Sequence, residues 1–162
     1  MKTELQDQIN LCTAEISDID TKMSSLSPLD KTKIYLTHYA LIKACGTIEY
    51  VFRSIVADYF SSSPMHQIHT YLEKTVRNGS MSATYENMCK LLGNFDDAWK
   101  NNFKAAVNAH PDKERLLDSS KSLVNNRHTF AHGRTPTATF QDIKNYYNDA
   151  IILLNLFDSV VV

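Results

Sequence analysis

Hydrophobic residues along this chain recur three or four positions apart over most of its length, which is the spacing of one face of an α-helix. The clearest stripe lies between residues 28 and 60 and consists of Ile34, Leu41, Cys45, Ile48, Phe52, Ile55 and Tyr59. Before it, Ser27 can cap a helix, Pro28 fits a first turn and Asp30 favours the N-terminal dipole. The pattern predicts one spine helix, roughly 45–50 Å long at ~1.5 Å per residue.

Glycine, proline and asparagine divide the rest of the chain into further helices. The expected ranges are 1–25, 64–77, 85–92, 96–108, 111–133 and 140–161. The first of these is a weaker amphipathic helix, and Thr139 with Asp142 resembles a capping box at the start of the last. No stretch alternates with period two and no repeat occurs. The chain is therefore expected to be one all-α helical bundle over residues 1–162, with a core bundle from residue 28 onward.

Two residues within the spine helix carry expectations of their own. Gly46 costs ~1 kcal/mol relative to alanine inside a helix, so it is expected to mark a close crossing with another helix. Glu49 is expected to be a solvent-exposed helix residue. The alternative is that Glu49 orients a functional side chain.

Composition is that of an ordinary soluble protein, with 43% hydrophobic and 22% charged residues. The three cysteines, Cys12, Cys45 and Cys89, are odd in number and form no C-x-x-C pair, so reduced thiols are expected. The polar, acidic start does not resemble a signal peptide. The longest aliphatic run, residues 151–154, is too short to span a bilayer. We therefore expect a cytoplasmic protein with no membrane partner.

Charge is distributed unevenly although the net charge is only −1. Residues 1–30 carry two lysines against six acidic residues, a balance of −4, whereas residues 111–134 carry five basic against three acidic residues, a balance of +2. A locally basic surface in a neutral protein suits a nucleic acid held by a few contacts, and it is equally compatible with a solvated helix face.

The densest polar group is Asn125-Asn126-Arg127-His128-Thr129-Phe130-Ala131-His132-Gly133, near the end of the penultimate long helix. A helix C-terminus favours cations, which accounts for Arg127 or His132 singly but not for the whole group. His128 and His132 are four apart and could grip a metal, yet no third ligand stands at a convincing distance. Phosphodiester chemistry is the third interpretation, since histidine can move a proton and arginine can neutralise a phosphate.

The segment RHTFAHG resembles the Arg-x-x-x-x-His motif of the HEPN superfamily. The resemblance extends over roughly residues 30–160, through the spine helix and through LLDSSKSLVNNRHTFAHG followed by FQDIKNYYNDAIILLNLFD. It is closest to the RiboL-PSP type of HEPN domain. The implied fold is a HEPN-like bundle with a long spine helix and the motif near the end of the penultimate long helix.

This resemblance implies a metal-independent endoribonuclease without cofactors, in which two protomers form one cleft. Arg127 would contact the scissile phosphate and His132 would transfer protons, while the 2′-hydroxyl of RNA attacks. His128 and Asn126 are expected to support this site, and Arg134 and Lys121 to bind substrate. RNA and a second protomer are the implied partners, and an antitoxin or sensor would suit a toxin or anti-phage effector.

Two positions depart from the family pattern. The residue after the motif arginine is commonly Asn in the superfamily, and here it is His128, which keeps a polar side chain with a role in proton transfer. HEPN toxins silenced by nucleotidylation carry Tyr two residues after the histidine, where this chain has Arg134, so that regulation is not expected. The alternative function is a HEPN-like dimerisation or partner- and nucleotide-binding module that does not cut RNA.

Overall fold

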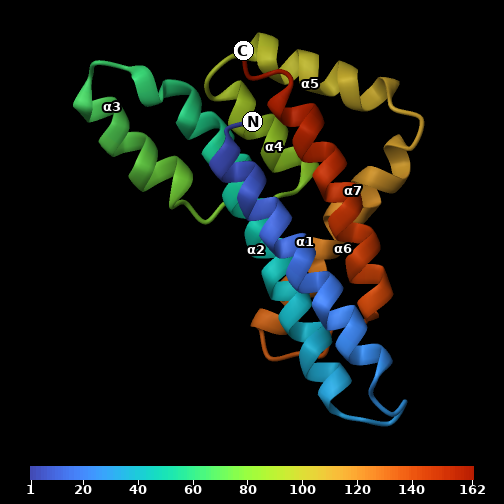
Figure 1. Cartoon of the computed structure of the whole chain (residues 1–162). Helices are drawn as coiled ribbons and strands as arrows, with labels where there is room; N and C mark the ends of the chain where they lie inside the picture. Colours follow the sequence, from blue (N-terminus) through green and yellow to red (C-terminus); the bar gives the residue numbers. More distant parts are fainter.

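A computed structural model describes the whole chain, residues 1–162, and contains seven α-helices and no β-strand (Figure 1). The helices are α1 (Thr3–Ser24), α2 (Thr32–Tyr59), α3 (His66–Tyr71), α4 (Tyr85–Gly93), α5 (Asp97–Ala109), α6 (Lys113–Ala131) and α7 (Phe140–Asp158). A short 3₁₀ turn, η1 (Phe60–Ser62), follows α2, and a π-helical segment, η2 (Leu72–Arg77), continues α3. The predicted all-α bundle is confirmed.

The core is one cluster of 36 buried apolar residues. Most of these residues lie on α1, α2, α6 and α7. Helix α2 packs against α1, α6 and α7, so it is the spine that the apolar stripe predicts. Both termini lie at the same end of the bundle, where the amino group of Met1 donates to Asp158 at 2.5 Å (Figure 1). Helix α5 crosses this end, and α3 with η2 projects to one side.

The spine helix starts later than predicted. Residues 25–31 form turns, and α2 begins at Thr32 because the Asp30 carboxylate accepts a hydrogen bond from the Thr32 N–H at 2.8 Å. Asp30 therefore lies before the helix and caps its first N–H group. The helix predicted over residues 64–77 begins at His66 and changes to π-helical spacing at Leu72, where the N–H of Asn78 bonds to the carbonyl of Glu73, five residues earlier.

The prediction that Gly46 marks a close helix crossing is wrong within this chain. Gly46 is solvent-exposed, and a Cβ built on it would meet nothing within 4 Å. Gly46 lies on the exposed side of α2, together with Tyr35 and Ile42.

Two polar features fix α6 and α7. Ser119 on α6 donates to the buried carboxylate of Asp149 on α7 at 2.7 Å. At the start of α7, Thr139 and Asp142 form the predicted capping box, with each side chain bonded to the other's backbone N–H. The first contact ties α6, whose end carries the motif, to α7, and the second fixes the start of α7.

Candidate active site around Arg127

Arg127 lies in the last two turns of α6 and points toward α2. Its Nη2 donates to the Glu49 carboxylate at 2.8 Å and to the Ser82 hydroxyl at 3.3 Å, and it lies 3.4 Å from Nε2 of His128. The same His128 nitrogen is 3.4 Å from the Ser82 hydroxyl. Glu49, Ser82, Arg127 and His128 are called the Arg127 cluster below. The cluster joins α2, α6 and the segment before α4.

The expectation that Glu49 would be solvent-exposed is wrong. Its side chain is only 14% exposed and forms an ion pair with Arg127, so the alternative interpretation, an orienting contact, describes its position. Helix α6 crosses α2 at this point and covers the carboxylate. Nothing in the local sequence around Glu49 distinguishes a buried, paired glutamate from an exposed one.

Buried neighbours surround the Glu49 carboxylate. The Cys45 thiol donates to the same oxygen at 3.6 Å, and burial, reinforced by the Glu49 charge, raises the pKa of Cys45 to about 12. Burial lowers the pKa of Arg53, with Glu49 opposing that shift. The Arg53 guanidinium donates to the Met81 carbonyl at 3.1 Å. Two arginines thus flank one carboxylate, and the local charge is net positive.

The Arg127 guanidinium is anchored through one nitrogen only. All of its hydrogen bonds use Nη2, and Nε is buried without a partner. A guanidinium carries five N–H donors, and the two on Nη1 are neither buried nor bonded to the protein. A side chain held in place with donors to spare is suited to binding an oxyanion.

His132 lies at the end of α6 and is its C-cap residue. The helix ends in a Schellman motif: the N–H of Arg134 bonds to the Thr129 carbonyl, the N–H of Gly133 bonds to the Phe130 carbonyl, and Gly133 has φ of 71°. This geometry leaves the His132 imidazole exposed and free of hydrogen bonds to the protein. Five helical positions separate it from Arg127, which corresponds to a divergence of ~140° around the axis.

The remaining predicted site residues lie outside the Arg127 cluster. Asn126 fixes the loop between α6 and α7: its side-chain oxygen accepts from the N–H groups of Thr137 and Ala138 at 3.1 and 3.0 Å. Arg134 and Lys121 are exposed and form no ion pair. The structure therefore joins the side chains of Arg127 and His128, but it brings no side chain of Asn126, His132, Arg134 or Lys121 into hydrogen-bond contact with them.

Sequence reasoning did not find Ser82 or Arg53. Ser82 precedes α4 in an irregular segment, 45 residues from Arg127, and nothing in its local sequence signals the contact. Arg53 carries a weak signal, since it is four residues from Glu49 on the same helix and therefore shares its face.

An exposed apolar stripe runs along α2 toward Glu49. Tyr35, Ile42, Gly46 and Glu49 are spaced 7, 4 and 3 apart, so they share one helix face. Tyr35 is 69% and Ile42 is 41% exposed. Beside them, the ring of Phe130 on α6, 36% exposed, stacks on His38 with ring centroids 4.6 Å apart. The Arg127 cluster therefore lies at the end of an apolar surface that one chain leaves uncovered.

Comparison with protein families identifies the family to which this chain belongs. The family model described as RiboL-PSP-HEPN matches residues 7–162, which is nearly the whole chain. The chain belongs to the RiboL-PSP-HEPN family. The resemblance noted in the sequence is thereby confirmed, and HEPN membership supports a nuclease or nucleotide-related role in general. No curated protein and no solved structure gives a significant match to the chain.

Two other features of the whole chain bear on its chemistry. None of the helices combines the length and the apolar character needed to cross a membrane. No group of three or more His, Cys, Asp or Glu side chains is arranged to hold a metal ion.

Proposed function

We propose that this HEPN domain is a metal-independent endoribonuclease whose active site is completed by a second protomer. The observation that carries the proposal is the arrangement of its two motif residues. Arg127 is held by Glu49 and Ser82 with spare donors, whereas His132 is exposed on another side of the same helix end. A cleft between two copies lets the arginine of one chain and the histidine of the other act on one phosphate.

The reaction needs no group beyond these side chains and the RNA. A His132 imidazole accepts the proton of the 2′-hydroxyl while the 2′-oxygen attacks the phosphorus. The bond from phosphorus to the 5′-oxygen breaks, and that oxygen takes a proton from the second His132. Arg127 stabilises the added negative charge on the phosphoryl oxygens. The products are a 2′,3′-cyclic phosphate and a 5′-hydroxyl, and the proton count is unchanged.

The apolar stripe on α2 supports pairing of two copies next to the site. Tyr35, Ile42 and Phe130 expose apolar surface, and exposed Gly46 would allow the backbone of a partner helix to approach closely. Because this face continues into Glu49, a second copy bound there lies against the Arg127 cluster. In this proposal Gly46 lies where α2 meets a helix of the second chain.

The other predicted site residues have lesser roles in this proposal. His128, in contact with both Arg127 and Ser82, supports the guanidinium and is close enough to take part in proton transfer. Asn126 acts indirectly, by fixing the loop beyond His132. Arg134 and Lys121 are exposed cations available for RNA phosphates.

The test is RNA cleavage by purified protein in excess EDTA, with total tRNA and a long transcript as substrates. Arg127→Ala and His132→Ala are compared with wild type, and His66→Ala, which removes another exposed histidine, is the matched control. Cutting that resists the chelator, leaves cyclic phosphates and disappears only in the two motif variants is the expected result. Cutting that survives both motif substitutions would reject the proposed site.

The exposed stripe also favours one alternative, a HEPN-like dimerisation or partner-binding module that does not cut RNA. A folded wild-type dimer that cuts neither substrate, alone or with the products of neighbouring genes, would favour this alternative. A role as a toxin or anti-phage effector follows from the proposed nuclease. It predicts that expression of the wild type, but not of Arg127→Ala, arrests growth unless an antitoxin or sensor restrains it.

A further inference from the structure

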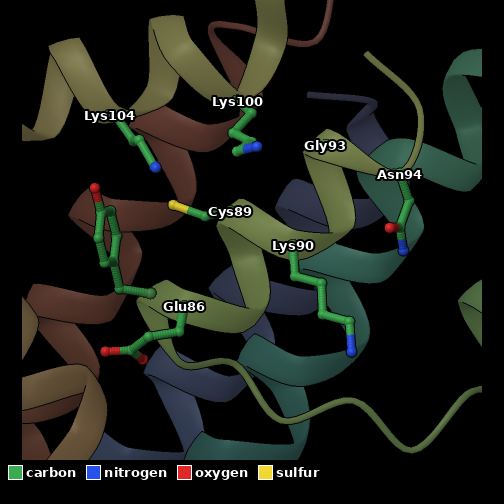
Figure 2. A pocket seen from close by; sticks show the side chains of 8 residues that line it. Glu86, Cys89, Lys90, Gly93, Asn94, Lys100 and Lys104 are labelled. Carbon is green, nitrogen blue, oxygen red and sulfur yellow. The ribbon is translucent and has the colours of Figure 1, made fainter. Parts of the chain in front are cut away.

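A second group of cations lies in a groove between α4 and α5. The groove has a volume of about 460 Å³, and none of its eight lining residues belongs to the Arg127 cluster. Figure 2 shows Lys100 and Lys104 extending from α5 toward Cys89 on α4, with Lys90 farther along α4. Three lysines therefore line one concave surface, together with a single carboxylate, Glu86.

The protein does little to neutralise these lysines. Lys90 and Lys104 form no ion pair. Lys100 forms one, with the Asp97 carboxylate at 3.3 Å, and the Asp97 side chain is itself 81% exposed. An exposed pair of this kind stabilises a protein very little. Lys100 and Lys104 are also four residues apart on one helix, a spacing at which like charges repel. The groove thus places three ammonium groups near one carboxylate, Glu86, which forms an ion pair with none of them.

Gly93 shapes the groove around Lys100. A Cβ built on Gly93 would lie 2.7 Å from Cδ of Lys100 and 3.5 Å from its Nζ. The aliphatic part of Lys100 therefore lies directly against the Gly93 backbone, which holds its ammonium group over the end of α4. Any larger residue at position 93 would displace that side chain.

We propose that this groove binds a phosphate group of the RNA substrate, at a distance from the bond that is cut. Ammonium groups bind phosphates as point charges, without reading base sequence. The inference rests on the proposed function for the identity of the ligand. Helix α4 connects the groove to the Arg127 cluster. Ser82, which contacts Arg127, lies three residues before the start of α4, and the nine residues of α4 extend ~13 Å from that start. An RNA strand leaving the Arg127 cluster along α4 reaches the lysines.

Binding is tested with a fluorescein-labelled 2′-O-methyl oligonucleotide, which cannot be cut because its 2′-oxygen cannot attack. The double variant Lys100→Gln/Lys104→Gln is compared with Lys22→Gln/Lys74→Gln, which removes the same charge from two exposed, unpaired lysines elsewhere. The groove variant is expected to raise Kd about tenfold or more. Its salt dependence should also weaken, by ~0.7 in log–log slope for each lost phosphate contact. Equal effects of the two double variants would overturn the proposal.

Two further tests leave the charge of the groove unchanged: the substitution Gly93→Ala and the protection of Cys89 from alkylation. Alanine suits a helix better than glycine, so Gly93→Ala is expected to stay folded while it displaces Lys100 and raises the oligonucleotide Kd. Cys89 lines the groove and is 7% exposed, against 0% for Cys12 and 1% for Cys45. The bound oligonucleotide should therefore slow alkylation of Cys89 by iodoacetamide, as followed by mass spectrometry.

Inorganic triphosphate, used in the same alkylation assay, distinguishes a site for the RNA backbone from a site for a free nucleotide. Protection of Cys89 by the oligonucleotide at concentrations where triphosphate has no effect supports an RNA backbone site. Protection by triphosphate alone would overturn the RNA assignment and indicate a site for a free nucleotide. None of these measurements requires cleavage, so a failure of the nuclease proposal and a failure of the groove proposal are seen separately.

Discussion

Glu49 on α2 and Arg127 on α6 are 78 positions apart in the chain, and their side chains meet at 2.8 Å. The pair is mostly covered, with 14% of the glutamate and 26% of the arginine side chain exposed. It fixes the guanidinium of the motif before any substrate binds. Preorganised charge of this kind stabilises a transition state without reorganisation during the reaction. Glu49 is therefore a positioning residue in the proposed nuclease.

Removing the Glu49 charge should reduce turnover more than substrate binding. We expect Glu49→Gln to lower kcat by about tenfold, equivalent to about 1.4 kcal/mol, with KM changed much less. Glu49→Ala should lower it further, because glutamine still offers an oxygen to Arg127. Steady-state cleavage of a short labelled RNA measures both constants. An increase in kcat would instead mean that the carboxylate competes with the phosphate for Arg127.

The same pair can be measured without activity. A double-mutant cycle of Glu49→Ala, Arg127→Ala and the combined variant, followed by urea unfolding, isolates their coupling free energy. For contacting side chains in one network we expect a coupling of about 0.5–3 kcal/mol. A coupling near zero would show that the ion pair is not formed in solution.

Mixing two inactive variants tests whether the site is shared. A heterodimer of Arg127→Ala and His132→Ala holds one intact arginine and one intact histidine, on different chains. If those two residues act together across the interface, co-refolded protein should regain at most about a quarter of wild-type activity, because half of the dimers are mixed and each holds one of two possible pairings. This is an upper limit, because the mixed dimer lacks the second His132 and water must protonate the leaving oxygen there. Mass spectrometry confirms that heterodimers form. Heterodimers without activity would indicate that each site is built within one chain or needs all four residues.

Most of the fold was predictable because it depends on local signals. The capping box at Thr139 and the buried stripe of α2 follow from caps and helical spacing, which act within a few residues. The position of Glu49 was not predictable, since its burial depends on how α6 crosses α2. Ser82 escaped detection for the same reason, because its contact joins segments 45 residues apart. The motif gave Arg127 and His132, but only the fold shows that their surroundings differ.

Two glycines should respond in opposite ways to the same substitution. Gly133 has φ of 71°, so Gly133→Ala should destabilise the monomer by about 1 kcal/mol through backbone strain alone, since nothing lies within 4 Å of the added Cβ. Gly46 is an exposed helical residue with the same free space, and Gly46→Ala should stabilise the monomer by about 0.5–1 kcal/mol. Urea unfolding at low protein concentration measures both changes. A larger residue, as in Gly46→Gln, should weaken dimers in sedimentation experiments if α2 forms the interface.

Asn126 should matter for stability through the loop that it holds. Asn126→Ala removes the acceptor for two backbone N–H groups and the donor to the Ser122 carbonyl at 2.9 Å, so we expect a loss of about 1–3 kcal/mol. Asn126→Asp keeps the acceptor and loses the donor, so it should cost less. Thermal unfolding compares the two variants. If Asn126→Ala leaves stability unchanged but abolishes cleavage, Asn126 acts in the chemistry and not in the loop.

The capping box of α7 should make part of the stability depend on pH. Hydrogen bonds from the Thr139 side chain and backbone lower the pKa of Asp142 below its ordinary value of 3.8. The folded state therefore favours the ionised carboxylate, so this contribution is complete above the ordinary pKa and is lost as pH falls through the lower pKa of the folded state. At pH 7, Asp142→Ala should cost about 1 kcal/mol, within the range for helix caps. Urea unfolding of both proteins at pH 7 and near pH 2.5 should show this difference shrinking at the lower pH. A difference that stays constant would mean that Asp142 acts through packing and not through its charge.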